Sequence, residues 1–136
     1  MAYIGDMPLH MTKIAYRSGS LENLRKWVER GPRTEMTTRY LPKRHEEMIG
    51  GSLFWIIDHT IVARSTITEF EQRPDGRWTI WLEPKLVQVY PRPKRAHQGW
   101  RYLADEDAPR DLSDGEEVGD ALPGKLAGRL ERLGLI

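Results

Sequence analysis

The chain has 136 residues, of which 39% are hydrophobic and 30% are charged, as expected of a single globular domain covering residues 1–136. It contains no cysteine, which excludes disulfides, thiolate catalysis and cysteine-based zinc sites. No apolar run approaches the ~20 residues of a membrane span, and residues 1–11 lack the pattern of a signal peptide. We therefore expect a cytoplasmic protein with no membrane partner.

The first part of the chain predicts a strand followed by a helix. Residues 8–16 have the character of a short strand. Leucines recur together with Trp27 and Val28 at helical spacing, which indicates an amphipathic helix over residues 21–30. The turn at residues 18–20 can cap this helix, and Gly31-Pro32 ends it.

A second strand and a short helix follow. Residues 34–41 are rich in threonine and aromatic residues, which favour strands. Pro42 suits the first turn of a helix over residues 43–49, and the pair Gly50-Gly51 ends that helix.

From residue 52 onward the pattern is that of short strands. Residues 53–57 form an almost continuous apolar run, as expected of a strand that is buried on both faces. Residues 61–71 alternate more openly, and the Pro74-Asp75-Gly76 sequence is a strong hairpin turn. Strands are also predicted for residues 77–83 and 86–90.

The net charge of +1 conceals two adjacent segments of opposite charge. Residues 91–103 carry four cations, two prolines and two aromatic residues, and the prolines exclude a helix interior or a central strand. Residues 104–120 carry eight acids against one arginine, a local charge of −7, and predict an acidic loop. Leucines at helical spacing then predict a C-terminal helix over about residues 121–133.

These elements predict an α+β fold. Strands joined by hairpins alternate with few helices, and so many short strands need protection for their edges. A small, partly closed β-barrel flanked by N-terminal and C-terminal helices provides that protection.

Several strings along the chain resemble a family of short bacterial proteins whose function is unassigned. The resemblance extends over nearly the whole chain, and its most specific string is Gln98-Gly99-Trp100-Arg101-Tyr102-Leu103. The other strings are Met7-Pro8-Leu9-His10, Pro42-Lys43-Arg44, Gly50-Gly51-Ser52-Leu53-Phe54-Trp55, Ala63-Arg64 and Pro91-Arg92-Pro93.

A second likeness concerns a short helix, a glycine and a strand with an arginine, here residues 44–49, Gly51 and Arg64. This arrangement resembles the opening of ASCH domains, which belong to the PUA-like superfamily. The resemblance implies a small PUA-like barrel that binds RNA or modified bases. ASCH domains carry a lysine shortly after the glycine, where this chain has Phe54-Trp55, so an ASCH-type amidohydrolase activity is not implied.

The cations and aromatic residues predict a groove for RNA or a nucleotide-like anion. Arginine and lysine neutralise phosphates, and exposed aromatic rings stack on bases. The candidate binding residues are Lys43, Arg44, Arg64, Arg92, Lys94, Arg95, Trp100, Arg101 and Tyr102.

Three alternatives remain open. In the first, the same cations pair with the acidic loop of their own chain. In the second, the protein is a small enzyme acting on a modified nucleoside through Arg64 with Asp58, His59 or Glu69. In the third, it is a protein-interaction module whose acidic loop docks a basic partner and whose terminal leucines form a homodimer. No catalytic residue is assigned, and scattered histidines without cysteine give no reason to expect a metal or cofactor.

Overall fold

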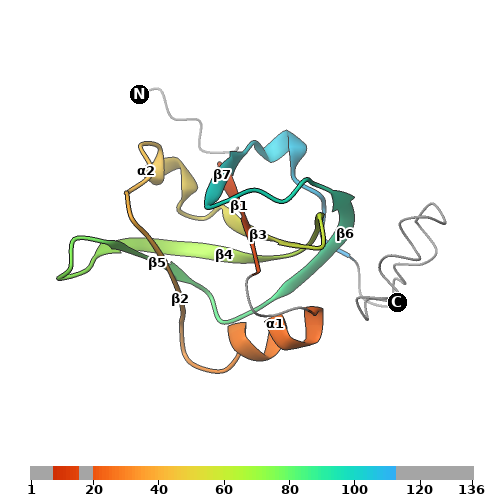
Figure 1. The fold of residues 1–136 in the computed structure, drawn as a ribbon, viewed down its shortest axis with the longest axis horizontal. Coiled ribbons are helices and arrows are strands. Elements are labelled where there is room, and N and C mark those ends of the chain that lie inside the picture. Colours follow the sequence, from red (N-terminus) through yellow and green to blue (C-terminus); the bar gives the residue numbers. More distant parts are fainter. Residues whose placement is uncertain (1–7, 16–19, 113–136) are drawn as a thin grey trace.

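The computed structural model describes residues 8–15 and 20–112 (Figure 1). The predicted C-terminal helix, the second half of the acidic loop and the terminal leucines of the predicted homodimer lie outside these residues.

Strands dominate the described residues, with two α-helices and one 3-10 helix, so the α+β class is confirmed. In chain order the elements are β1 (His10–Ile14), α1 (Leu21–Val28), β2 (Thr34–Thr38), α2 (His45–Met48), β3 (Ser52–Ile57), β4 (Thr60–Gln72), β5 (Trp78–Leu82), β6 (Val87–Pro93), β7 (Trp100–Leu103) and the 3-10 helix η1 (Asp105–Asp107).

All seven strands belong to one mixed sheet, in the order β2-β5-β4-β3-β1-β7 with β6 paired to β4. The long strand β4 pairs with β3 along one edge, while β5 and β6 follow each other along its other edge. Strand β1 lies parallel to β3 and antiparallel to β7. The chain between β1 and β3 contains α1, β2 and α2, which gives the long connection that a parallel pair requires.

Strand pairing within residues 8–15 and 20–112 does not close the sheet into a ring. Instead, the chain leaves β7, passes through η1 and returns to β6 over residues 104–112, which we call the strap. Tyr90 N–H donates to the Arg110 carbonyl at 2.9 Å, and Leu112 N–H donates to the Gln88 carbonyl at 3.0 Å. The strap thus spans the open side between β7 and β6. The finer assignment to a partly closed PUA-like barrel stays a prediction.

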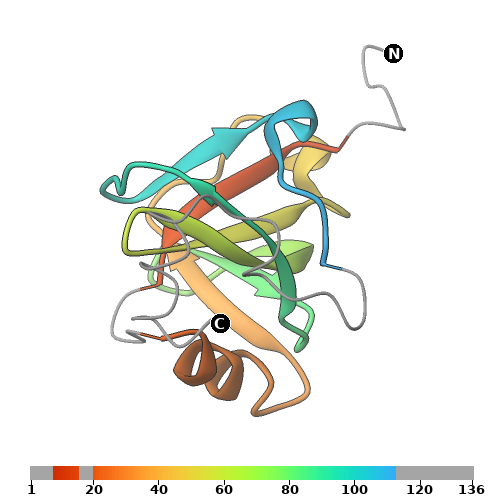
Figure 2. The same cartoon turned by 90° about the vertical axis from the view of Figure 1, so that its right-hand side faces the viewer.

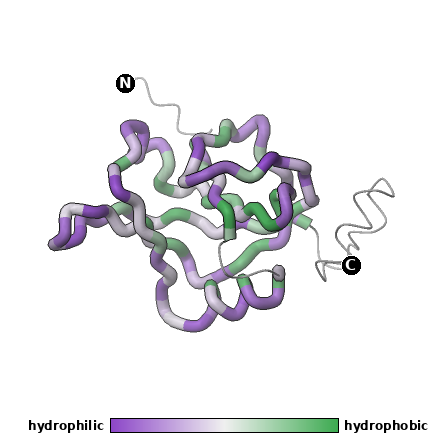
Figure 3. The backbone as a smooth tube through the Cα atoms, in the orientation of Figure 1, coloured by the Kyte–Doolittle hydropathy of each residue, from purple (hydrophilic) through white to green (hydrophobic). Residues whose placement is uncertain are grey.

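The core has two parts because β3 is buried on both faces, as predicted from its apolar run. On one face Trp55 packs edge-on against Trp27 of α1, with 6.0 Å between ring centroids, and its indole N–H donates to the Ser65 hydroxyl at 3.1 Å. On the other face Phe54 joins a smaller apolar cluster against which Ala108 of the strap packs. The segments with hydrophobic residues accordingly lie towards the inside of the molecule (Figure 3). Helix α1 lies at the end of the molecule opposite β7 (Figure 2).

Two features of residues 91–103 go beyond the sequence analysis. Strand β6 continues through Pro91 and Pro93, which it tolerates because, of the strands that the structure describes, β4 alone pairs with it. Strand β7 was not predicted at all, yet it pairs with β1 from His10 to Lys13. Among the described residues, no helix has the length and apolarity needed to cross a membrane.

Candidate functional site

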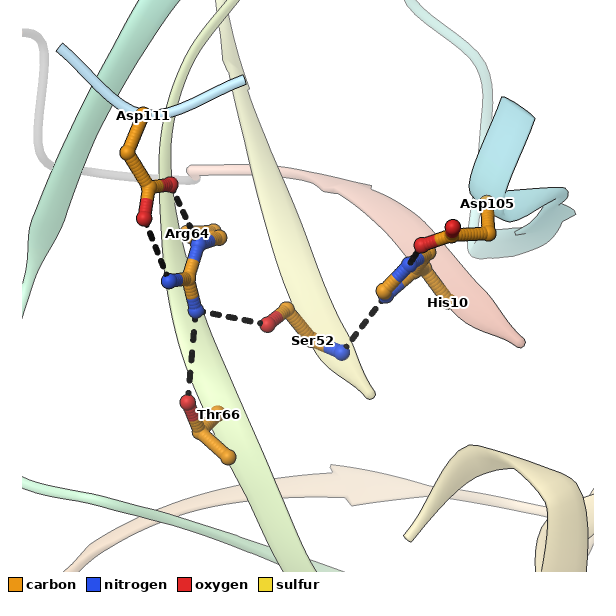
Figure 4. Close-up of polar contacts among 6 residues, drawn as sticks. All are labelled: His10, Ser52, Arg64, Thr66, Asp105 and Asp111. Carbon is orange, nitrogen blue, oxygen red and sulfur yellow. Dashed lines mark hydrogen bonds and ion pairs between the residues drawn. The ribbon is translucent and has the colours of Figure 1, made fainter. Parts of the chain in front are cut away.

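Five polar residues form a continuous network on the face of the sheet that the strap crosses (Figure 4). An Nε2 to Oδ1 contact of 2.7 Å joins His10 on β1 to Asp105 on η1. The Ser52 N–H donates to His10 Nδ1 at 2.9 Å, and Arg64 Nη1 donates to the Ser52 hydroxyl at 3.0 Å. Arg64 Nε and Nη2 each donate to a carboxylate oxygen of Asp111 at 2.7 Å. Both ends of the strap are therefore fixed to the sheet through acids.

His10 orients the strap and has no ring nitrogen left for chemistry. Because Nδ1 accepts the Ser52 N–H, the neutral ring carries its proton on Nε2 and donates that proton to Asp105. The ring is buried and packs edge-on against Phe54, with 5.2 Å between centroids. His10 was not among the binding residues predicted from the sequence, and no local pattern in β1, which also contains Thr12 and Lys13, distinguishes it.

Arg64 forms an ion pair with Asp111 of the same chain. The two parallel bonds to Asp111 are the forked geometry that guanidinium and carboxylate groups favour. These bonds raise the pKa of Arg64 and lower the pKa of Asp111. Thr66 adds a further contact, accepting from Arg64 Nη1 at 3.3 Å. At this residue the arrangement is the internal charge pairing that sequence analysis left open.

We expect the contribution of Asp111 to stability to disappear at low pH. Its folded pKa lies below the ordinary value of 3.8, so the contribution is present above that value and is lost as the pH falls through the lowered pKa. The side chain of Asp111 is 45% exposed, and solvent screening limits the contribution to about 1 kcal/mol. Urea unfolding of Asp111→Asn should thus differ from wild type by this amount at neutral pH and converge with it in acid.

The matched control for this prediction is Asp107→Asn, another acid of the strap. Among the described residues the Asp107 carboxylate makes no ion pair, so this variant should unfold like wild type within ~0.5 kcal/mol. A wild-type advantage over Asp111→Asn that stays constant down to the most acidic pH would contradict the assignment.

A pocket of about 410 Å³ lies beside the network. Its polar wall comes from the network residues other than Asp111 and from Arg110, and its apolar wall comes from Phe54 and from Ala108 and Pro109 of the strap. The lining residues are His10, Gly50, Ser52, Phe54, Arg64, Asp105, Ala108, Pro109 and Arg110. We call it the Arg64 pocket.

A second pocket, of about 270 Å³, brings three of the sequence-predicted binding residues together. It lies where the end of β6 approaches β7, and we call it the Tyr102 pocket. Arg92, Lys94 and Tyr102 line it, together with Ile61, Pro93, Leu103, Ala104 and Asp107. Arg92 Nη1 donates to the Asp107 carbonyl at 2.9 Å, which places that guanidinium against the strap.

Tyr102 presents a partly exposed ring that its neighbours hold in place. The side chain of Trp100 packs against the main core and meets the Tyr102 ring edge-on at 4.8 Å. Arg44 N–H donates to the Tyr102 hydroxyl at 3.2 Å, and the Arg44 guanidinium lies 5.9 Å from the ring centroid. Arg44 is itself held by two 2.7 Å bonds to Glu47. Trp100 thus anchors β7, while Tyr102 is 40% exposed and offers a stacking surface.

Three cations, Lys13 of β1, Lys94 and Arg101, lie close enough to His97 to act on its charge. Burial is the largest factor that lowers the pKa of His97, and Arg101, Lys94 and Lys13 lower it further, against a raising contribution from the Gln98 backbone. His97 Nε2 lies 2.8 Å from the Thr12 hydroxyl of β1. No ion pair joins Lys94 or Arg101 to another described residue.

His59 holds the chain that follows β6 in place. Its carbonyl accepts the Lys94 N–H and its Nδ1 accepts the Ala96 N–H, both at 2.9 Å. The role is one that sequence analysis missed, because the contact joins residues 37 positions apart.

The residues of the enzyme alternative are not gathered in one place. Glu69 pairs with Arg33 at 2.9 Å. Glu69 follows His59 by ten residues, and along the extended strand β4 this separation is roughly 30 Å. Arg64 is occupied by Asp111. Among residues 8–15 and 20–112, no group of three or more potential metal ligands occurs.

The other two predicted residues, Lys43 and Arg95, are exposed outside both pockets.

Comparison with known proteins gives one match. A family model described as "Protein of unknown function (DUF1489)" matches residues 11–136. The match therefore includes every residue of the two pockets except His10. No curated protein and no solved structure matches the chain.

Proposed function

The chain belongs to a family of proteins of unknown function (DUF1489), and from its pockets we propose that it binds RNA or a nucleotide-like anion. The binding surface consists of the Tyr102 pocket and the cations around His97. The observation that carries the proposal is the meeting of Arg92, Lys94 and the partly exposed ring of Tyr102 in one pocket. With it we propose a PUA-like barrel, in which the strap occupies the position of a closing strand.

The chemistry of the pocket suits a single-stranded nucleotide unit. Arg92 and Lys94 supply positive charge for a phosphate, and Tyr102 supplies a ring face for a base, a contact worth roughly 1–3 kcal/mol. A volume of about 270 Å³ is near the lower end of pockets for small ligands, which fits one nucleotide and not a duplex. Arg101 and Arg95 extend the cationic surface along the loop for neighbouring phosphates.

Direct binding tests the proposal. A labelled single-stranded RNA of mixed sequence should bind the wild type at low salt, and the affinity should fall steeply between ~50 and ~200 mM salt. The double variant R92A/K94A should weaken binding and flatten the salt dependence. Tyr102→Ala should weaken binding about tenfold without changing the salt slope, because it removes stacking and no charge.

The matched control is Lys26→Ala on α1, which removes one positive charge from an exposed side chain at the end of the molecule opposite β7. Its affinity should equal that of the wild type. The proposal fails if the wild type does not bind RNA at low salt, or if Lys26→Ala weakens binding as much as the pocket variants.

RNA binding should also raise the pKa of His97. In the free protein burial lowers that pKa below the ordinary value and the neighbouring cations lower it further, and a bound polyanion would neutralise the cations. By linkage, RNA should then bind more tightly as the pH falls through the His97 titration. NMR titration of the His97 ring with and without RNA measures this; an unchanged pKa in the saturated complex would place the RNA elsewhere.

A further inference from the structure

The Arg64 pocket has no part in the proposed RNA surface, yet it is lined by hydrogen-bond donors. Arg64 projects from β4, and its Nη1 is fixed by the hydroxyls of Ser52 and Thr66. Because the Ser52 oxygen accepts from Arg64, its own hydrogen is directed elsewhere and can be donated to a ligand. Arg110 contributes a second guanidinium, stacked 4.6 Å from the ring centroid of Tyr90.

The Asp111 carboxylate occupies the edge of Arg64 that another anion would bind. The Asp111 carboxylate binds the Nε and Nη2 edge in the geometry that any carboxylate or phosphate would adopt. Arg64 is the more buried partner, with a side chain 24% exposed, whereas the side chain of Asp111 is 45% exposed. A competing anion can thus replace Asp111 without leaving a buried charge unpaired.

The rest of the lining restricts the ligand. Phe54, Ala108 and Pro109 form an apolar wall that suits a small organic group. Asp105 lies in the same lining as an acceptor, so the pocket disfavours a second negative charge there and favours a hydroxyl or amine.

We propose that the Arg64 pocket binds a small organic oxyanion, a carboxylate or a phosphate monoester, which replaces Asp111 on Arg64 and contacts Arg110. Displaced from Arg64, Asp111 releases the end of the strap that pairs with β6.

The simplest oxyanions test the site. Acetate and inorganic phosphate are titrated separately into the wild type and Asp111→Asn at constant ionic strength set with chloride, and the Arg64 Nε–H resonance is followed by NMR. Without the competing carboxylate, Asp111→Asn should bind about tenfold or more tightly than the wild type. The anion that binds more tightly identifies the class of ligand. Asp107→Asn, which changes the strap charge equally, should behave as the wild type.

Two outcomes overturn the proposal. The first is equal affinities for the wild type and Asp111→Asn. The second is binding that survives in the R64Q/D111N double variant, followed there by the backbone amide resonances of the residues that line the pocket.

A measurement on the wild type alone keeps the proposal falsifiable if Asp111→Asn does not fold. Saturating phosphate should shift the Arg64 Nε–H resonance and accelerate hydrogen exchange at the amides of Tyr90 and Leu112, which bond across the strap and β6. Unchanged resonance and exchange would overturn the proposal. No RNA enters either assay, so the two proposals succeed or fail separately.

Discussion

Replacing Gly51 with alanine is expected to destabilise the protein by about 3 kcal/mol, near the upper end for an overpacked site. A Cβ at this position would overlap the Leu9 carbonyl oxygen and lie 3.0 Å from the Met48 carbonyl oxygen. The backbone cannot move aside, because Gly51 N–H donates to Met48 at 2.9 Å and its carbonyl accepts from Ile67 at 2.8 Å. Residue 52 is the centre of the polar network, so the disturbance should reach His10 as well.

Two other glycines are controls for the Gly51 prediction. Gly31→Ala adds its methyl group into open space and should unfold in urea within ~0.5 kcal/mol of the wild type. Gly50→Ala also meets no atom, but its φ of +89° should cost about 1–2 kcal/mol. A loss of stability that decreases from Gly51→Ala to Gly50→Ala to Gly31→Ala would separate steric overlap from backbone strain. Equal unfolding midpoints for Gly51→Ala and Gly31→Ala would show that the close approach of Leu9 does not exist.

Features of the fold that depend on neighbouring residues were predictable. The apolar run of β3 predicted burial on both faces, and all six of its residues are buried. Ser20 was expected to cap α1, and its hydroxyl accepts the Asn23 N–H at 3.1 Å. The Pro74-Asp75-Gly76 turn joins β4 to β5, with Gly76 at a φ of +88°. In each case the chemistry that decides the conformation lies within a few residues.

Features that depend on distant residues were not predictable. Strand β7 pairs Tyr102 with Met11, and no local pattern specifies a register across so many residues. Pairing of the predicted binding cations with the acidic loop was one alternative from the sequence, but the sequence did not indicate which acid would pair with Arg64. That choice depends on the return of the strap to β6, where Val89 pairs with Asp111.

The position of the strap also changes the meaning of the adjacent acidic and basic segments. Its acids Asp105 and Asp111 are taken by His10 and Arg64 on the face of the sheet. Among the described residues, no ion pair joins an acid of the strap to Lys94 or Arg101. The acidic segment next to the basic segment suggested internal neutralisation. In the described residues it forms a paired site at Arg64 and Asp111, and the cations near His97 form a separate basic surface.

His10→Ala is expected to destabilise the protein by about 3 kcal/mol or more, because it combines two losses. The buried ring and its packing against Phe54 disappear, leaving a cavity. The Ser52 N–H loses its acceptor in a buried position, and Asp105 loses its donor. Urea unfolding at neutral pH measures the loss of stability. Amide hydrogen exchange in the strap measures the release of the strap from β1.

Two conservative variants of His10 divide this effect between its two bonds. His10→Asn retains an acceptor near the position of Nδ1 for the Ser52 N–H but cannot reach Asp105, whereas His10→Gln can reach Asp105 and gives up the Ser52 bond. Because Ser52 N–H is buried and Asp105 is exposed, His10→Gln should be the less stable of the two. Exposed His59→Ala, which loses one bond to Ala96, should cost at most ~1 kcal/mol. If His10→Ala costs no more than His59→Ala, the bond between His10 and Asp105 does not hold the strap, and its contacts with Arg64 and β6 must fix it to the sheet.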